Sequence, residues 1–516
     1  MREKKIDTFK WKILLVVVIT IVASTALTYG FFVVNKRQTG QNEVVSGCFD
    51  VQLVDETASI NLTNSYSMSD EDGKKTNPYS FGITNTCDIE ATYYIVLDVK
   101  DGSFGSEHIN VMVDGSDPRA LNNYILNTSY PAESGYSSSY ILKRGTLAKG
   151  EKDTFEVRAW INEAATYEDV SGKSFVAQVR VVNVVKEVDD ELFPSFQTKI
   201  KKASNGTKDS FASTATTDEG IFEMEDDYGT SYYYRGAVED NYVKFGQNKT
   251  GQDMYWRIIR LNGDGSLRII YDGTSAHVNG EESTDRAAMT NVSWNTNDND
   301  AKYIGYMFGG ENGVASTSKD QAQTNETSSN IKTELEKWYK DNIVDTGYSN
   351  TVSDEIFCND RSFADDNTGT GFGTSTTYYA AYGRVGPGVS NPQPSFKCPE
   401  KNDSFTMSDT IKGNGALEYP VGLITADEIV AAGGKWDTVN TNYYLYKGTG
   451  YWSLSPYIYD SRAYVFVVHR YGRLFNYYMY GNVVVAPVVN LSAEYANTLI
   501  GEGTMTDPYR APGVEP

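Results

Sequence analysis

The stretch Tyr451–Leu491 reads YWSLSPYIYDSRAYVFVVHRYGRLFNYYMYGNVVVAPVVNL. It contains Trp452 and ten other aromatic residues, with three arginines and a histidine between them. Two Val-rich runs, Ala463–Val468 and Val483–Val489, predict β-strands. Such a density of Tyr, Trp, Arg and Asn is typical of a binding surface, because rigid amphipathic rings give contact area at little entropic cost. It is equally typical of a structural sheet that is held together by cross-strand aromatic pairs.

The N-terminus predicts a membrane anchor. Five of the first twelve residues are basic, and Ile13–Val34 carries no charge. These twenty-two residues at ~1.5 Å each span roughly 33 Å, which is enough for a hydrocarbon core of ~30 Å. The basic flank predicts that residues 1–12 are cytoplasmic and that the chain after Asn35 is extracellular. We therefore expect a single-pass cell-membrane protein with an uncleaved signal anchor at residues 13–34; a cleaved signal peptide is the alternative.

The cysteines fit an exported chain. They fall as two separated pairs, Cys48 with Cys87 and Cys358 with Cys398. An even count outside the cell predicts one disulfide in each of two domains, and free buried thiols are the alternative. No C-x-x-C spacing is present, so zinc and redox chemistry have little support.

The overall charge bears on the partners. The 516-residue chain has a formal net charge of -22. This balance argues against a nucleic-acid partner, because phosphate binding needs clustered Lys and Arg. Given the typical size of a protein domain, the length predicts about three domains.

Residues 47–186 predict an all-β antiparallel sandwich. Short segments of β-forming residues alternate with turn residues, and helical periodicity is missing. The expected strands are Cys48–Val54, Tyr79–Thr84, Thr92–Val99, Ser139–Leu142, Thr154–Trp160 and Ser174–Val185. Residues 187–213 are polar and charged, as expected of a linker.

Residues 214–510 predict an α+β domain with long loops. Strands are expected at Tyr255–Leu261 and Leu267–Tyr271, and the Asn-Gly-Asp-Gly turn between them is a strong hairpin signal. Apolar residues at helical spacing predict a helix over Asn330–Ile343, with Asn330 as its cap.

A second, short helix is expected after Thr425. The sequence T-A-D-E forms a capping box there, with Glu428 at its third position. The segment before it, Tyr419–Ile424, predicts a strand, and the loop-rich region between the two helices holds Cys358 and Cys398.

Several separate motifs of the C-terminal half together resemble one family. They are Thr217–Gly220 (TDEG), Tyr228–Ala237 (YGTSYYYRGA), Tyr255–Arg260 (YWRIIR), Tyr419–Glu428 (YPVGLITADE), Tyr451–Pro456 (YWSLSP), Pro487–Leu491 (PVVNL) and Gly501–Tyr509 (GEGTMTDPY). As a set they resemble membrane-anchored, largely uncharacterised surface proteins of gut Firmicutes. The resemblance implies a C-terminal domain similar to the C-type-lectin and formylglycine-generating-enzyme fold. One departure is Ala486, where members of the family commonly have an Arg before the Pro of the last strand.

The first domain has its own resemblance. Its pattern, from SGCFDVQL through NPYSFGITNTC to EDVSGKSF, resembles membrane-proximal β-sandwiches of Gram-positive surface proteins. It is similar, on architecture alone, to the fibre-forming sandwiches of TasA and camelysin. The resemblance implies a spacer or an assembly module.

The resemblance divides the opening stretch in two. In the lectin-like fold the Trp of a W-x-x-x-P strand packs in the core, which implies a structural role for Trp452. Tyr457–Asn482 is then the candidate display surface. The same fold hosts hypervariable ligand-binding proteins made by diversity-generating retroelements, whose variable positions favour the residue types of this window. The candidate ligand-binding residues are Tyr457, Tyr459, Asp460, Tyr464, His469, Arg470, Tyr471, Arg473, Phe475, Asn476, Tyr477, Tyr478 and Tyr480.

These features favour a binding protein over an enzyme. The three histidines have no metal-triad spacing, Cys358 and Cys398 do not reproduce the copper-binding pair of formylglycine-generating enzymes, and no cofactor or metal is expected. The S-x-x-K matches at Ser316 and Ser329 are chance matches in a Ser-rich chain. We expect a cell-surface protein that binds an extracellular protein or glycan. The alternatives are a structural or fibre-associated surface protein and an extracellular enzyme of the formylglycine-generating-enzyme fold.

Overall fold

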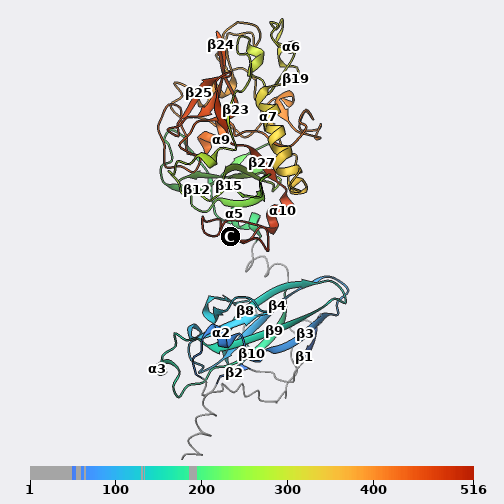
Figure 1. Ribbon diagram of the computed structural model, residues 1–516, viewed down its shortest axis with the longest axis vertical. Helices are drawn as coiled ribbons and strands as arrows, with labels where there is room; N and C mark the ends of the chain where they lie inside the picture. Colours follow the sequence, from blue (N-terminus) through green and yellow to red (C-terminus); the bar gives the residue numbers. More distant parts are fainter. Residues whose placement is uncertain are drawn as a thin grey trace, which may run out of the picture. The chain divides into compact units, whose positions relative to one another are not determined.

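The computed structural model describes residues 49–53, 60–62, 66–129, 132, 134–184 and 195–515. The chain divides into two compact units, Met1–Phe193 and Pro194–Pro516 (Figure 1). The predicted cytoplasmic segment, the predicted anchor at residues 13–34 and Cys48 all lie outside the described residues. Within the described ranges, no helix has the length and apolar character needed to cross a membrane.

The N-terminal unit is built from two five-stranded antiparallel sheets. The first has the order β1 (Phe49–Leu53), β3 (Tyr79–Asn85), β9 (Lys152–Ile161), β5 (Ile109–Val113) and β6 (Arg119–Ala120). The second has the order β2 (Ile60–Asn61), β10 (Val176–Val184), β4 (Ala91–Lys100), β8 (Tyr136–Leu147) and β7 (Ile125–Leu126). Two single-turn helices, α2 (Asp70–Gly73) and α3 (Tyr167–Val170), lie between strands.

Side-chain alternation explains this sandwich. In β4 the side chains of Tyr93, Ile95 and Leu97 belong to one buried cluster, together with Phe81 and Phe155 from the other sheet. Successive strand residues point to opposite faces, so these three share the face that meets the first sheet. Each of the six expected strands coincides with an observed strand, although β8 extends beyond the expected one at both ends; β5 and the two-residue strands β2, β6 and β7 were not predicted.

The C-terminal unit contains two larger sheets. A seven-stranded sheet has the order β11 (Ser204–Thr207), β12 (Asp218–Glu225), β13 (Thr230–Gly236), β15 (Asp253–Leu261), β16 (Leu267–Gly273) and β27 (Val488–Leu491), with β14 (Tyr242–Gln247) also paired to β15. A six-stranded sheet has the order β17 (Met289–Val292), β26 (Val483–Val485), β23 (Tyr451–Asp460), β24 (Arg462–Val468) and β25 (Leu474–Tyr478), with β21 (Thr377–Tyr378) also paired to β23. Nearly all pairings are antiparallel; β11 with β12 and β23 with β26 are parallel.

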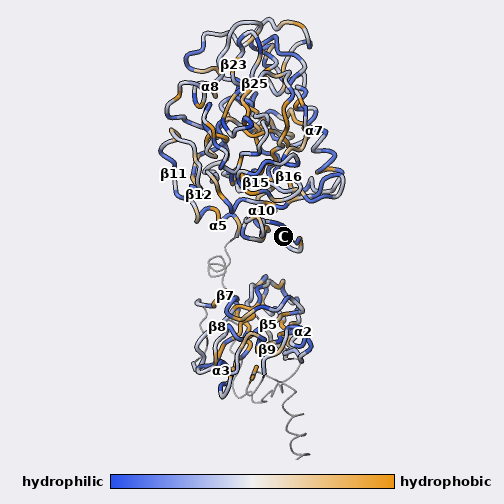
Figure 2. The backbone as a smooth tube through the Cα atoms, turned by 60° about the vertical axis from the view of Figure 1, so that its left-hand side comes forward, coloured by the Kyte–Doolittle hydropathy of each residue, from blue (hydrophilic) through white to orange (hydrophobic). Residues whose placement is uncertain are grey.

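Short helices and two small two-stranded sheets complete this unit. The helices are α5 (Phe196–Lys202), α6 (Lys319–Gln323), α7 (Asn330–Tyr339), α8 (Ala380–Val385), α9 (Ala426–Ala431) and α10 (Ala493–Thr498). The small sheets pair β18 (Met307–Phe308) with β19 (Thr327–Ser328) and β20 (Phe357–Cys358) with β22 (Ser404–Phe405). One buried apolar cluster contains side chains from both large sheets. In Figure 2 the hydrophobic segments of this unit lie mainly inside and the hydrophilic loops outside. Phe196 and Ile200, from the stretch expected to be a linker, belong to that cluster.

Two of the expected features of this unit are confirmed, and one cap is corrected. β15 and β16 form the expected hairpin, and Gly265 in its turn has φ 91°, a conformation that glycine adopts without steric cost. The capping box is present, with Thr425 and Glu428 each accepting the other's backbone N–H at the start of α9. For α7, however, the cap is Ser329, whose side chain accepts from the Lys332 N–H. This places the second S-x-x-K match in a helix cap.

The expected strand at Tyr419–Ile424 is wrong. This segment forms only an isolated bridge, between Gly422 and Val488. Its carbonyl groups instead accept from side chains and from another strand, since Val421 accepts from the Tyr306 hydroxyl and Ile424 accepts from the Leu454 N–H. The apolar run is buried without being in a sheet, because other polar groups satisfy its backbone.

Candidate functional site

The candidate residues lie on one antiparallel meander. β23 turns into β24 at Ser461, which has φ 60°, and β24 pairs with β25 from Tyr464↔Tyr478 to Val468↔Leu474. β25 is the outermost strand of this sheet. Side chains on these strands therefore divide between the protein interior and the open surface.

Several candidate residues face the interior. Tyr457 is 8% exposed and Tyr459 is 1% exposed. The Trp436 ring stacks on Tyr457 at 5.1 Å and on Phe475 at 5.3 Å, so both of its faces are covered. Burial raises the pKa of the Tyr457 hydroxyl well above its usual range. These rings hold the sheet to the loop after α9, and they leave little ring surface for a ligand.

Trp452 is also structural, as the resemblance implied. It is fully buried, and its Nε1 donates to the Val292 carbonyl at 2.8 Å. Its ring lies 6.2 Å from the ring of Trp294 and 6.1 Å from that of Tyr477. Trp452 thus connects the core to the exposed tyrosines described next.

Three neighbouring candidate tyrosines form a group that we call the tyrosine strip: Tyr477 and Tyr480 are exposed, and Tyr478 is half-buried. The Tyr477 and Tyr478 rings stack at 4.5 Å, and the Tyr480 ring lies 4.8 Å from Tyr478. Tyr477 is 37% exposed and Tyr480 is 47% exposed. Arg462 donates to the Tyr480 hydroxyl at 3.0 Å and lies over the Tyr478 and Tyr480 rings.

A second exposed group lies in the turn between β24 and β25. Tyr471 is 44% exposed, Arg470 lies over its ring at 4.9 Å, and His469 packs against the same ring at 5.2 Å. Burial and the nearby Arg473 and Arg470 lower the pKa of His469, so this ring is neutral at pH 7. Arg473 pairs with Asp437.

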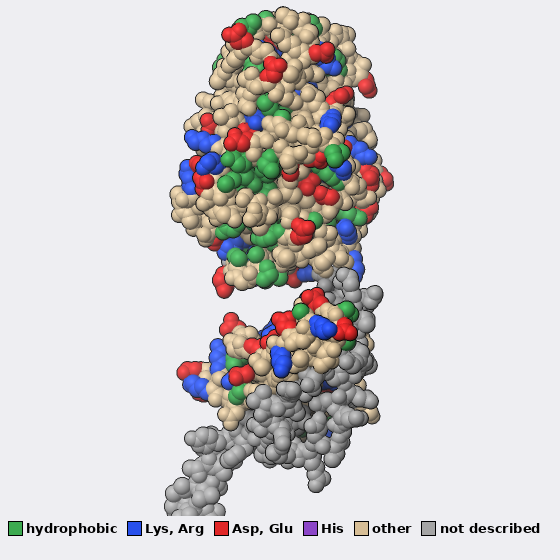
Figure 3. All heavy atoms as spheres, turned by 90° about the vertical axis from the view of Figure 1, so that its right-hand side faces the viewer, with side chains coloured by type: hydrophobic (Ala, Val, Ile, Leu, Met, Phe, Trp, Pro, Cys, Tyr) green, Lys and Arg blue, Asp and Glu red, His purple; other side chains and the backbone are tan. Residues whose placement is uncertain are grey.

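The other candidate residues are spread around these groups. Asp460 is exposed at the end of β23, while Tyr464 and Asn476 are half-buried. The sequence did not single out the half-buried rings of Trp436 and Tyr382, which pack against Tyr457, or of Tyr378, which packs against Tyr382. On the face drawn in Figure 3, hydrophobic side chains gather in patches among acidic and basic ones.

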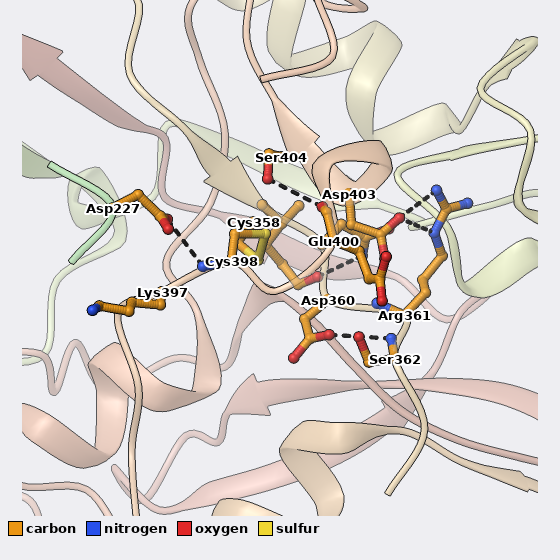
Figure 4. The surroundings of a disulfide bond; sticks show 12 residues. Asp227, Cys358, Asp360, Arg361, Ser362, Lys397, Cys398, Glu400, Asp403 and Ser404 are labelled. Carbon is orange, nitrogen blue, oxygen red and sulfur yellow. Dashed lines mark hydrogen bonds and ion pairs between the residues drawn. A yellow bond between two sulfur atoms is a disulfide. The ribbon is translucent and has the colours of Figure 1, made fainter. Parts of the chain in front are cut away.

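The disulfide Cys358–Cys398 is present, as predicted (Figure 4). The backbone N–H of Cys398 donates to Asp227 at 2.9 Å, and the neighbouring Arg361 pairs with Asp403 at 2.6 Å. Cys87 is disulfide-bonded as well.

Among the described residues, no group of His, Cys, Asp and Glu side chains suits a metal ion.

A buried ionic cluster was missed by the sequence analysis. Glu428 lies 3.1 Å from Arg260 Nε and 2.6 Å from Arg268 Nε, and Arg260 Nη1 also lies 2.6 Å from Asp226. All four side chains are at most 9% exposed. The capping box at Glu428 was visible in the sequence, but its arginine partners Arg260 and Arg268 are 168 and 160 positions away. No local spacing connects them.

Comparison with known proteins gives no relative for this chain: no family model, no curated protein and no solved structure matches it.

Proposed function

We propose that the C-terminal unit is a ligand-binding module of a cell-surface protein and that the tyrosine strip is its contact surface. The observation that supports this most is a row of three adjoining rings beside Arg462, of which Tyr477 and Tyr480 are exposed and Tyr478 is half-buried. Contiguous exposed aromatic surface is uncommon in a soluble domain and marks interaction sites. Tyr and Arg are also the residue types that dominate binding energy at interfaces.

Some of the candidate residues are buried and others are exposed, so the proposed binding site contains fewer residues than the sequence suggested. Tyr457, Tyr459 and Phe475 are occupied by contacts inside the protein. The strip and the exposed Tyr471 remain accessible. The ligand that fits this surface is an extracellular protein or a glycan, since both bind to aromatic faces flanked by hydrogen-bonding groups.

The remaining parts of the proposal come from the sequence. A single N-terminal anchor would hold the two units outside the cell, and the C-terminal unit would have a C-type-lectin-like fold. Its mostly antiparallel sheets with few helices are compatible with this fold. Nucleic acid is not among the expected ligands, because the chain carries a net charge of -22.

Alanine substitution of the strip tests the proposal. Full-length protein is applied to glycan and peptide arrays, and the hits are measured again with Tyr477, Tyr478 and Tyr480 changed to Ala. We expect binding to be lost with little change in the melting temperature. The matched control is Tyr167→Ala, since Tyr167 is 79% exposed in the N-terminal unit.

Two outcomes would contradict the proposal. Equal binding by the wild type and the triple variant would remove the strip as the site. A large drop in melting temperature would support the structural interpretation of these rings. Electron microscopy of the purified protein tests the fibre-associated alternative, which requires filaments.

A further inference from the structure

A cavity of about 390 Å³ lies in the C-terminal unit, between the turn that joins β14 to β15 and the C-terminal end of α7. Cavities of roughly 300–1,000 Å³ hold small-molecule ligands, so this one has room for more than a few water molecules. Among the described residues, its lining shares no member with the tyrosine strip or with the buried ionic cluster. It is therefore a separate candidate site.

The two sides of this cavity are fixed to each other. The end of α7 continues into a π-helical turn over Lys340–Val344, a geometry that is frequent at functional sites. This turn carries Asn342, whose Oδ1 accepts from the Lys249 N–H at 3.0 Å, and Asp341, whose carboxylate lies 3.2 Å from Lys249 Nζ. The β14–β15 turn is thus held against the helix, and the cavity between them is preformed.

Three aromatic rings form the inner wall. The rings of Trp256, Tyr271 and Trp338 pack edge-to-face in all three pairs, with centroids 5.6 Å, 6.2 Å and 6.0 Å apart. Trp256 is fully buried, and its Nε1 donates to the Phe245 carbonyl at 2.9 Å. Tyr271 and Trp338 line the cavity and are 5% and 9% exposed. Their mutual packing fixes the positions of the two lining rings.

The polar ends of the two lining rings are unused. Neither the Tyr271 hydroxyl nor Trp338 Nε1 makes a hydrogen bond within the described ranges, and neither is among the enclosed polar atoms that lack a partner. Both atoms are therefore accessible from the cavity. Burial raises the pKa of the Tyr271 hydroxyl well above its usual range, so the hydroxyl remains a donor at neutral pH. A ligand that displaces water here must supply hydrogen-bonding groups of its own.

The rim adds acceptors and donors without a net charge. Lys249 and Lys337 balance Glu334 and Asp341 among the lining side chains. In the part of the chain that the structure describes, the Glu334 carboxylate and the Lys337 ammonium group make no ion pair with each other or with another residue. The Gln252 Oε1 is occupied by neighbouring side chains, which leaves its Nε2 as a further donor.

We propose that this cavity binds a neutral sugar unit, with the Tyr271 hydroxyl and Trp338 Nε1 donating to its oxygen atoms and Glu334 accepting from its hydroxyl groups. Each sugar hydroxyl donates and accepts at once, which matches this mixed set of partners. The half-buried Ala288 and Met289 offer apolar surface to the C–H face of the sugar ring.

Other ligand classes fit these walls less well. A purely apolar ligand would leave the Tyr271 and Trp338 polar atoms without partners, which is unfavourable. A strongly charged ligand would find no excess of opposite charge. The site goes beyond the proposed function, because it does not involve the tyrosine strip.

Ligand-observed NMR titration of the full-length protein tests this site. The probes are the methyl glycosides of glucose, galactose, mannose and N-acetylglucosamine. Cyclohexanol is the matched control, because it keeps a six-membered ring but has a single hydroxyl. We expect at least one glycoside to bind and cyclohexanol not to bind. The same glycoside should shift the indole N–H signal of Trp338, which Trp338→Phe assigns among the seven tryptophans.

Variants locate the binding. Tyr271→Phe keeps the three packed rings and removes only the unused hydroxyl, so it should weaken the binding about three- to tenfold, the value of one hydrogen bond, with an unchanged melting temperature. Glu334→Gln should weaken it by a similar factor, because a charged acceptor becomes neutral. Glu494→Gln, at an exposed glutamate in α10, is the control and should bind like the wild type.

The strip variant separates this site from the proposed function. With Tyr477, Tyr478 and Tyr480 changed to Ala, the glycoside should bind as it does to the wild type. Loss of binding in that variant would assign the sugar to the strip, which would overturn this inference and leave the proposed function intact. No binding by any glycoside, equal binding of cyclohexanol, an unshifted Trp338 signal, or unchanged affinity of Tyr271→Phe would each overturn it as well. Should Trp338→Phe fail to fold, Tyr271→Phe and Glu334→Gln still decide.

Discussion

Replacing Glu355 with Gln should change how the stability of the C-terminal unit depends on pH. Glu355 is 7% exposed, and its pKa rises from 4.5 to about 7, first because of burial and then because of Asp264. A carboxyl whose pKa is raised on folding stabilises the protein below its unfolded pKa, and this stability is lost as pH rises toward its folded pKa. At ~1.4 kcal/mol per pH unit, the wild type should lose roughly 3 kcal/mol between pH 4.5 and pH 7 through this group. The Gln variant cannot ionise and should not show this loss.

Urea unfolding at several pH values measures the difference. Five of the seven tryptophans lie in the C-terminal unit, so their fluorescence mainly reports this unit. The quantity of interest is the free energy of unfolding of the variant minus that of the wild type, because other carboxyls cancel in it. We expect it to grow by roughly 3 kcal/mol from pH 4.5 to pH 7. Glu494→Gln, an exposed glutamate in α10, is the control, and a difference that stays constant with pH would refute the reasoning.

Four further predictions concern the same unit. Changing Cys358 and Cys398 together to Ser should lower the free energy of unfolding by about 4 kcal/mol in a denaturant titration, because their disulfide closes a loop of 40 residues. Trp452→Ala should cost about 3–5 kcal/mol in the same measurement, since the side chain is fully buried. Tyr480→Ala should cost about 0.5 kcal/mol or less, because the ring is 47% exposed; a cost like that of Trp452 would place it in the core. Thr425→Ala should lower the melting temperature by removing the α9 cap, a loss of about 1 kcal/mol.

A hairpin turn, a helix cap and a disulfide were predictable from the sequence. The hairpin at Asn262–Gly265, the capping box at Thr425 and the disulfide Cys358–Cys398 all follow from residues that are adjacent in sequence or are chemically unique. The buried position of Trp452 also agrees with the expectation. The physical reason is that turns and caps depend on a few neighbouring residues.

Burial within an aromatic stretch was not predictable. Tyr457 and Tyr480 are the same residue type in the same window, yet one is 8% exposed and the other 47%. What separates them is Trp436, which comes from the loop after α9 and covers Tyr457. The buried ionic cluster was not predictable for a related reason. Arg260 and Glu428 lie on distant segments of the sequence and come together only in the folded protein. Tertiary contacts of this kind leave no local pattern in a single sequence.

The stacking of Trp436 between two rings has a consequence for how this surface can evolve. Trp436 stacks on Tyr457 and Phe475, while the exposed rings of Tyr471 and Tyr480 contact the neighbouring side chains of Arg470, His469, Arg462 and Tyr478. Mutations at the exposed positions should therefore leave the fold nearly as stable, because surface substitutions usually change stability by about 0.5 kcal/mol or less. If the sheet binds a ligand as we propose, its specificity can change through these exposed side chains without a new fold.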